Sequence, residues 1–171
     1  MPRTLLAVAV LTVMIGATAQ AQEKLDANVI DNKGASIGSI ALRGSAAGVV
    51  LRVTLKAGSL TPGWHGVHLH AVADCSDAEK FLNAKAHINH DNKKHGLLNA
   101  EGPDNGDIPN VFAAADGSVN AELFTPFAKL TGANGLQDAD GSAFVIHAAE
   151  DDHSTQPIGN AGARVGCAVI K

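Results

Sequence analysis

The chain has 171 residues, and its formal net charge at pH 7 is −4. Hydrophobic residues make up 46% of it, which is enough to fill one sizeable core in a chain of this length. The mildly acidic balance argues against nucleic acid or an anionic membrane as a partner, because both attract basic surfaces.

The N-terminal segment has the order of a secretory signal peptide. A short basic start ends at Arg3, an apolar run covers 5–15, and small residues lead to Ala21. The run is too short to span a bilayer, and the order is typical of a cleaved leader. We expect 1–21 to be a signal peptide and 22–171 to be one domain. It would be periplasmic or otherwise exported and free of the membrane after cleavage.

Short apolar or alternating segments recur along the rest of the chain, separated by Gly, Asn and Asp. This spacing, with few signals for a long helix, is typical of an antiparallel β-sandwich or barrel. We therefore predict an all-β fold. The segments that we expect to form strands are 27–31, 37–42, 48–55, 66–72, 110–114, 117–124, 142–148 and 164–170.

Three longer segments interrupt this rhythm, namely 74–110, 131–142 and 148–163. Long loops on a compact β scaffold are usually functional or held in order by something. The first of them is polar and rich in His, Asp, Asn and Lys. We expect at most one short helical turn in it, over 76–84.

The chain has two cysteines, Cys75 and Cys167. In an exported protein an even number of cysteines indicates a disulfide. This one would close a loop of about 90 residues, which is worth roughly 4–5 kcal/mol in the chain-entropy model.

Three histidines fall within the stretch GWHGVHLH, residues 63–70. If 66–70 form a strand, side chains alternate between its faces, so His68 and His70 share one face and His65 points to the other. Two imidazoles on one face of a strand suit a transition metal. The pair alone is weak evidence for a site, and we interpret His65 as a packing residue.

Further histidines and carboxylates follow along the chain. A lone histidine in an apolar strand is more often a core residue than a ligand, but this many in one exported β domain favour copper or zinc. We interpret Asp152 and His153 as surface residues. The remaining candidates are His87, His90, His95, Asp104, Asp107, His147 and Asp151.

Four blocks of the sequence resemble the copper/zinc superoxide dismutases, in particular the exported type of bacteria. They are HGVHLH (65–70), AHINHDNKKHG (86–96) continuing to GPDNGDIPN (102–110), FVIHAAEDD (144–152) and GNAGARVGCAVI (159–170). The last block is the most specific. The blocks and the strands between them cover essentially the whole chain after the leader. The resemblance implies a flattened Greek-key barrel of about eight strands with long metal-binding and active-site loops.

The resemblance also implies a copper site. Its four ligands match His68, His70, His87 and His147, and the match at His87 is a histidine that bridges copper to zinc and relays a proton. Arg164 matches an arginine beside the copper that guides the superoxide anion. The intrasubunit disulfide matches Cys75 and Cys167.

A zinc site is implied beside it, with His87, His95 and Asp107 among its ligands. Asp151 matches an acid that joins the two sites by hydrogen bonds. The family's third zinc histidine is expected at position 104, where this chain has Asp104. Zinc accepts aspartate oxygen at about the same distance as histidine nitrogen, so two histidines and two aspartates form a reasonable set.

Two other readings of the zinc site stay open. His90 lies in the same loop and could supply the missing nitrogen, although it matches a position that does not bind metal. Alternatively, the zinc site is weak or empty and copper acts alone.

The resemblance implies an enzyme that converts superoxide to dioxygen and hydrogen peroxide. Copper changes valence in this reaction and zinc cannot. One alternative is a copper-only dismutase, and another is a non-catalytic sandwich that binds or stores copper. A storage protein would need neither Arg164 nor a bridging His87, which favours the enzyme. Family members occur as monomers and as dimers, so a homodimer is one option.

Overall fold

The structure is a computed structural model that describes residues 23–171. The signal peptide expected over 1–21 lies outside the described residues and stays a prediction, as does the domain boundary at 22. The described part contains a 3₁₀ helix, η1 (Leu82–Ala84), and nine strands. They are β1 (Glu23–Asp31), β2 (Ser36–Ser45), β3 (Gly48–Leu55), β4 (Gly63–His65), β5 (Val67–His70), β6 (Val111–Ala113), β7 (Val119–Thr125), β8 (Ser142–His147) and β9 (Arg164–Ile170).

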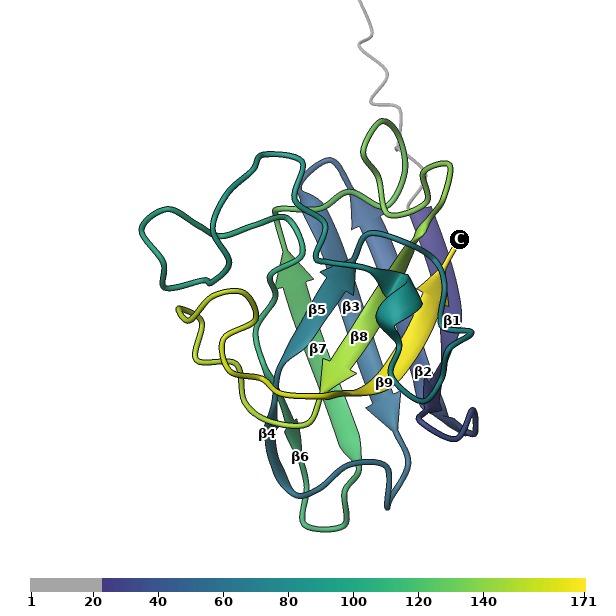
Figure 1. Cartoon of the computed structure of the whole chain (residues 1–171). Coiled ribbons are helices and arrows are strands. Elements are labelled where there is room, and N and C mark those ends of the chain that lie inside the picture. The colour runs from purple at the N-terminus through teal and green to yellow at the C-terminus, as the bar shows by residue number, and fades with distance from the viewer. Residues whose placement is uncertain (1–22) are drawn as a thin grey trace, which may run out of the picture.

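Seven strands form one antiparallel sheet in the order β5-β8-β9-β1-β2-β3-β7, and β4 pairs with β6 in a second sheet. The larger sheet curls, so that β5, β8 and β9 lie in front of β2, β3 and β7 in Figure 1. β6 contacts β7, which brings the small sheet against one edge of the large one. The prediction of an all-β antiparallel barrel is confirmed.

The stretch 63–70 is divided between the two sheets, and the strand expected over 66–72 is the shorter β5. β4 ends at His65 and β5 begins at Val67, so the chain changes sheet at Gly66. A Cβ at Gly66 would lie 2.8 Å from the Cβ of Ala161, an approach that only glycine allows. This close contact, which a single-strand pattern does not reveal, is the physical reason for the break.

The core follows from the alternation of side chains along the strands. In β3, the buried residues Val49, Leu51, Val53 and Leu55 alternate with residues that point outward, such as the exposed Arg52. Full burial of each such side chain contributes roughly 1.5–3 kcal/mol. The main apolar cluster joins this face of β3 to the inward faces of β2, β5 and β8.

β8 is buried along its whole length because both of its faces are covered. Phe144 and Ile146 point into the main core, whereas Val145 packs in a second cluster on the opposite face. Residues that face each other across an antiparallel pair point to the same side, and His68 pairs with Val145. The predicted pair His68 and His70 therefore lies on the face away from the main core.

Loops cover that outer face. One runs over 71–110, between β5 and β6, and another over 148–163, between β8 and β9. Parts of both project from the same side of the barrel, on the left of Figure 1. Both were expected as loops, and the helical turn within 76–84 is the short η1. Within 23–171, no helix is long and apolar enough to cross a membrane.

The predicted disulfide between Cys75 and Cys167 is confirmed. The two Cα atoms are 5.9 Å apart, and the cysteines are separated by 92 positions in the sequence. The bond ties the first part of the 71–110 loop to β9. It packs with Phe81 and Val145 in the second apolar cluster.

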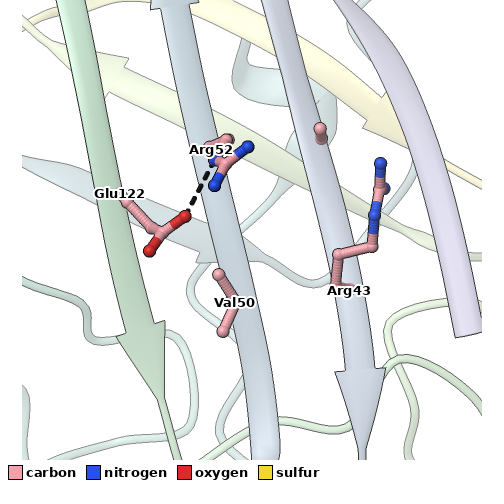
Figure 2. Close-up of a pocket in the computed structure, with 5 residues that line it drawn as sticks. Arg43, Val50, Arg52 and Glu122 are labelled. Carbon is pink, nitrogen blue, oxygen red and sulfur yellow. Dashed lines mark hydrogen bonds and ion pairs between the residues drawn. The ribbon is translucent and has the colours of Figure 1, made fainter. Parts of the chain in front are cut away.

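The outward face of β2, β3 and β7 carries a shallow pocket of about 270 Å³, drawn in Figure 2. Arg52 Nε donates to Glu122 Oε2 over 2.8 Å across neighbouring strands, and both side chains are exposed. Exposed ion pairs of this kind contribute little, about 0–1 kcal/mol. None of the predicted metal ligands lines this pocket, so it plays no part in the site below.

Candidate metal centre

Five histidine ring nitrogens are buried without a hydrogen-bond partner among the described residues. One is Nδ1 of His153, and the other four are Nδ1 of His68 and Nε2 of His70, His87 and His147. Buried polar atoms are nearly always satisfied, so a group of four without partners indicates a ligand at that place. These are the four residues predicted to bind copper.

The other ring nitrogen of three of these histidines is fixed by an acceptor. His68 Nε2 donates to Asp151 Oδ2 over 2.8 Å, and His70 Nδ1 donates to the carbonyl of Lys85, also over 2.8 Å. His147 Nδ1 donates to the carbonyl of Gly162 over 3.0 Å. Each proton therefore sits on the far side of its ring, and the unpartnered nitrogen keeps its lone pair for a metal.

The strands place three of the four. His68 and His70 lie on β5, His147 ends the neighbouring β8, and their nitrogens come within 4.8 Å of one another. His87 comes from the loop, where it bridges to the backbone of His70. Its ring centroid lies 4.2 Å from that of His68. Four imidazole nitrogens form a set that suits copper.

A second group of possible ligands adjoins the first through His87. His87, His95, Asp104 and Asp107 each offer an atom within 4.8 Å of the others. His87 Nδ1 lies 3.0 Å from Asp104 Oδ2, and His95 Nδ1 lies 2.6 Å from Asp107 Oδ1. Two imidazoles and two carboxylates form a set that zinc accepts.

Backbone N–H groups fix the orientation of the Asp104 and Asp107 carboxylates. Asp107 Oδ2 accepts the N–H groups of Gly96 and Asp104, and Asp104 Oδ1 accepts the N–H of Gly106. The opposite oxygens, Asp104 Oδ2 and Asp107 Oδ1, are left facing the histidines. Asp104 is only 4% exposed, so it lies inside the group and not at its rim.

Asp151 connects the two groups. Oδ2 accepts from His68 Nε2, and Oδ1 accepts from His95 Nε2 over 3.2 Å. The position expected to join the two metal sites is therefore in contact with one histidine of each. Burial by itself would raise the pKa of Asp151, but the hydrogen bonds from His68 and His95 lower it.

The two groups differ in the charge they favour. Burial lowers the pKa of His68 to about 3 and that of His147 to about 4, so these rings stay neutral and able to ligate. For His95, burial is outweighed by hydrogen bonds to Asp107 and Asp151, which raise its pKa to about 10. The carboxylate-rich group thus attracts a cation, and a divalent metal can replace the proton.

Arg164, at the start of β9, faces the same site. Its guanidinium donates to the carbonyls of Phe81 and Lys85, over 2.5 and 2.7 Å. A pocket of about 290 Å³ is lined by Arg164 together with His70 and His87. A fixed cation thus lies in an opening that both histidines line.

A model of the copper/zinc superoxide dismutase family matches residues 36–170. This chain belongs to the copper/zinc superoxide dismutase family. The family, the enzyme class and the two metals that the sequence blocks predict are thereby confirmed, and the two ligand groups fit those metals.

Curated relatives in this dismutase family cover most of the chain. A superoxide dismutase [Cu-Zn] of Caulobacter vibrioides is 49% identical over 142 residues, 81% of this chain and 80% of the relative. One from Escherichia coli K12 is 34% identical, with 100% of both chains covered.

Solved structures show the same fold. A SOD-like protein from Bacillus subtilis is 32% identical with a TM-score of 0.81, over 88% of this chain and 100% of that one. The Cu/Zn superoxide dismutase from Brucella abortus is 27% identical with a TM-score of 0.71, over 87% and 100%.

Two histidines outside the implied dismutase ligand set stay outside the ligand groups. His65 is buried, and its ring nitrogens contact the carbonyls of His147 and Thr61 at 2.7 and 2.8 Å. It packs behind the site, as the sequence predicted, although His65 stands on β4 and the pair on β5, so the two do not belong to one strand. His90 is exposed and belongs to no group of possible ligands within 23–171.

Sequence reasoning missed two residues beside Asp151. His153, interpreted as a surface residue, has a side chain that is only 19% exposed and lies 3.4 Å from Asp151 Oδ2. Asn110 bonds to both backbone groups of Asp151. Its place at the end of the GPDNGDIPN block was the only available signal.

Gly159 offers a test of how tightly Asp151 is held. Its φ is +59°, and a Cβ there would lie 1.6 Å from Asp151 Oδ1. Gly159→Ala is expected to lower the free energy of unfolding by about 3 kcal/mol, from left-handed strain plus overpacking. It should also weaken metal binding, because the carboxylate must move. Denaturant unfolding and metal content measure the two effects.

Gly34→Ala is the matched control. Its φ is +75°, but nothing lies within 4 Å of a Cβ there. It should cost only the backbone strain, about 1–2 kcal/mol, and leave metal content unchanged. Equal effects of the two variants would contradict the contact with Asp151.

Proposed function

We propose that this chain removes superoxide at a copper held by His68, His70, His87 and His147, beside a zinc held by His87, His95, Asp104 and Asp107. The observation that carries the copper assignment is that four buried, unpartnered ring nitrogens belong to neighbouring rings. Three of the residues form one ligand group, and the ring of His87 lies 4.2 Å from that of His68. Two superoxide anions and two protons give one dioxygen and one hydrogen peroxide. Copper, when bound, supplies the one-electron change of valence that this reaction needs.

His87 holds and moves a proton in this scheme. Its Nδ1 faces Asp104 and Asp107. Its Nε2 is buried without a partner, in a ring 4.2 Å from that of His68 and 5.1 Å from that of His70. Nε2 is therefore the ring atom that takes up a proton and passes it to the developing peroxide. Asp104 and Asp107 keep the ring in place from the other side.

Arg164 attracts and orients the substrate. Superoxide is a small anion, and the guanidinium is held by two carbonyls at the pocket that His70 and His87 line. Both hydrogen bonds go to carbonyl oxygens, so they leave the guanidinium its positive charge, and the nearby carboxylate of Asp77 acts on it only electrostatically. A fixed positive charge at this position draws the anion in and stabilises the negative charge that grows on peroxide.

The zinc group carries one more negative charge than a set with a third histidine. Two carboxylates neutralise a divalent ion completely, so the copper beside it feels less positive charge. We infer that copper is harder to reduce here than in a site with three zinc histidines. The buried place of Asp104, 3.0 Å from His87 Nδ1, supports its role as a ligand.

Export to the periplasm is part of the proposal. A disulfide of this kind persists in oxidising compartments and is rare in the cytosol, and the chain begins with a leader-like sequence. The substrate is then superoxide outside the cytoplasm, and a homodimer is one form the enzyme can take.

The test is to purify the protein from 22 onward, measure copper and zinc per chain, and assay superoxide removal. Activity with one copper and one zinc supports the proposal. Activity with copper and no zinc supports the copper-only dismutase, and bound copper without activity supports copper storage.

Asp104→His tests the zinc set directly. We expect zinc affinity to rise about tenfold, because imidazole is the better partner for zinc in this family and mutual repulsion of two carboxylates is removed. Competition with a chelator measures the change. His90→Asn, which removes an exposed imidazole of the same loop, should leave zinc affinity unchanged. A loss of affinity there would assign the ligand to His90 instead.

A further inference from the structure

His153 places a buried nitrogen against the carboxylate that links the two metal sites. Nδ1 of His153 lies 3.4 Å from Asp151 Oδ2 and has no hydrogen-bond partner among the described residues. The backbone N–H of the same residue donates to Asp151 Oδ1 over 2.6 Å. One residue thus approaches both oxygens of Asp151.

Asn110 determines which ring nitrogen of His153 carries the proton. Asn110 Oδ1 accepts the N–H of Asp151 over 3.0 Å, so the other amide atom is the NH₂ group, which donates to the carbonyl of Asp151 over 2.8 Å. That NH₂ group also lies 3.2 Å from His153 Nε2. Nε2 must therefore accept, and in a neutral imidazole the proton is then on Nδ1.

The carboxylate of Asp151 has one place left for this proton. A carboxylate offers about four lone-pair directions. Oδ1 accepts from His95 Nε2 and from the N–H of His153, whereas Oδ2 accepts only from His68 Nε2. The unpartnered Nδ1–H of His153 lies at the oxygen that has accepted once.

The backbone around His153 is held from the zinc loop. Its φ is +58°, in the left-handed region. Its carbonyl accepts the N–H of Leu98 over 3.0 Å, and a Cβ at Gly96 would lie 2.2 Å from that carbonyl oxygen. The imidazole of His153 therefore projects from a segment where the 148–163 loop contacts the 71–110 loop, and not from a free surface turn.

We propose that His153 is a positioning residue, whose Nδ1–H faces Asp151 Oδ2 across 3.4 Å and holds it electrostatically while Asn110 holds the ring from the other side. This rests on the proposed role of Asp151. His153 thereby limits rotation of the carboxylate, which keeps the protons of His68 and His95 on Nε2 and their Nδ1 atoms toward the metals. Neither His153 nor Asn110 touches a metal ligand atom itself.

Two variants separate this role from simple packing. The amide of His153→Asn has its NH₂ where Nδ1 was, and asparagine tolerates a positive φ. The amide of His153→Gln lies where Nε2 was, so it keeps a partner for Asn110 but loses the donor to Asp151. In protein loaded with both metals, zinc release to a chromogenic chelator should be about threefold to tenfold faster in His153→Gln, below the effect of a direct partner of a ligand. Release from His153→Asn should stay within about twofold of the unchanged protein.

Asp151→Asn and His90→Asn complete the experiment. If Asp151→Asn does not speed release, the proposed role of Asp151 itself fails. If it does, and His153→Gln and His153→Asn release zinc equally fast, only the role of His153 is overturned. His90→Asn should match the unchanged protein, which excludes a general effect of removing a histidine from these loops.

The position of the proton on the His153 ring can also be measured by NMR in the unchanged protein. Long-range ¹H–¹⁵N spectra of the zinc-loaded protein near pH 7 should show His153 with the proton on Nδ1 and a bare Nε2. A proton on Nε2 would overturn the proposal, whatever the release rates show.

Discussion

Replacing His70 by alanine is expected to remove copper and to lower the rate of superoxide removal on the order of a thousandfold, which corresponds to about 4 kcal/mol of activation free energy. His70, like His147, is a selective choice among the four copper histidines. It belongs to the ligand group with His68 and His147 and to none of the groups that contain His95, Asp104 or Asp107. Zinc should therefore stay bound while copper is lost.

Metal analysis and the superoxide assay check this result together. His90→Ala is the control, because that ring is exposed and lies outside the ligand groups of the described residues. Copper retained at one per chain in the His70 variant, with activity intact, would remove His70 from the site. Loss of zinc along with copper would show that the two groups are not separable.

Replacing both Cys75 and Cys167 by serine should lower the free energy of unfolding by about 4–5 kcal/mol. The bond joins positions 92 apart, and a loop of that length loses much of its freedom in the unfolded chain when it is closed. Denaturant unfolding of the protein with and without the bond measures the difference. An unchanged free energy of unfolding would contradict the chain-entropy account.

The disulfide should also affect activity, through Arg164. The loop that it ties to β9 contains Phe81 and Lys85, whose carbonyls hold the guanidinium. Without the bond these carbonyls are free to move, so the arginine is no longer fixed at the pocket. Activity per bound copper should fall in the serine variant, and unchanged activity per copper would separate Arg164 from the disulfide.

One part of this centre followed from the alternation of side chains. The pattern separated His68 and His70 from His65, and the structure places the pair on the outer face of β5 and His65 behind it. The resemblance then supplied partners from distant parts of the chain, such as His147. Period-two patterns carry this information because facing residues of paired strands point the same way.

Contacts between loops could not be predicted in this way. Nothing in the local sequence shows that Gly66 packs against Ala161, or that His153 turns inward to Asp151. Both depend on how two loops cross after the strands have paired. The same holds for Asp104, whose burial among the zinc-side residues depends on the path of the 71–110 loop.

The two metal groups have different origins in the chain, and this has a thermodynamic consequence. Three copper histidines stand on hydrogen-bonded strands, so their positions cost no further conformational entropy when copper arrives. His95, Asp104 and Asp107 all lie in one long loop. Zinc binding must therefore also supply the free energy that restricts that loop, at about 1–2 kcal/mol for each residue newly ordered. Copper therefore binds to side chains on rigid strands, whereas zinc binding also orders the loop that covers the copper ligands.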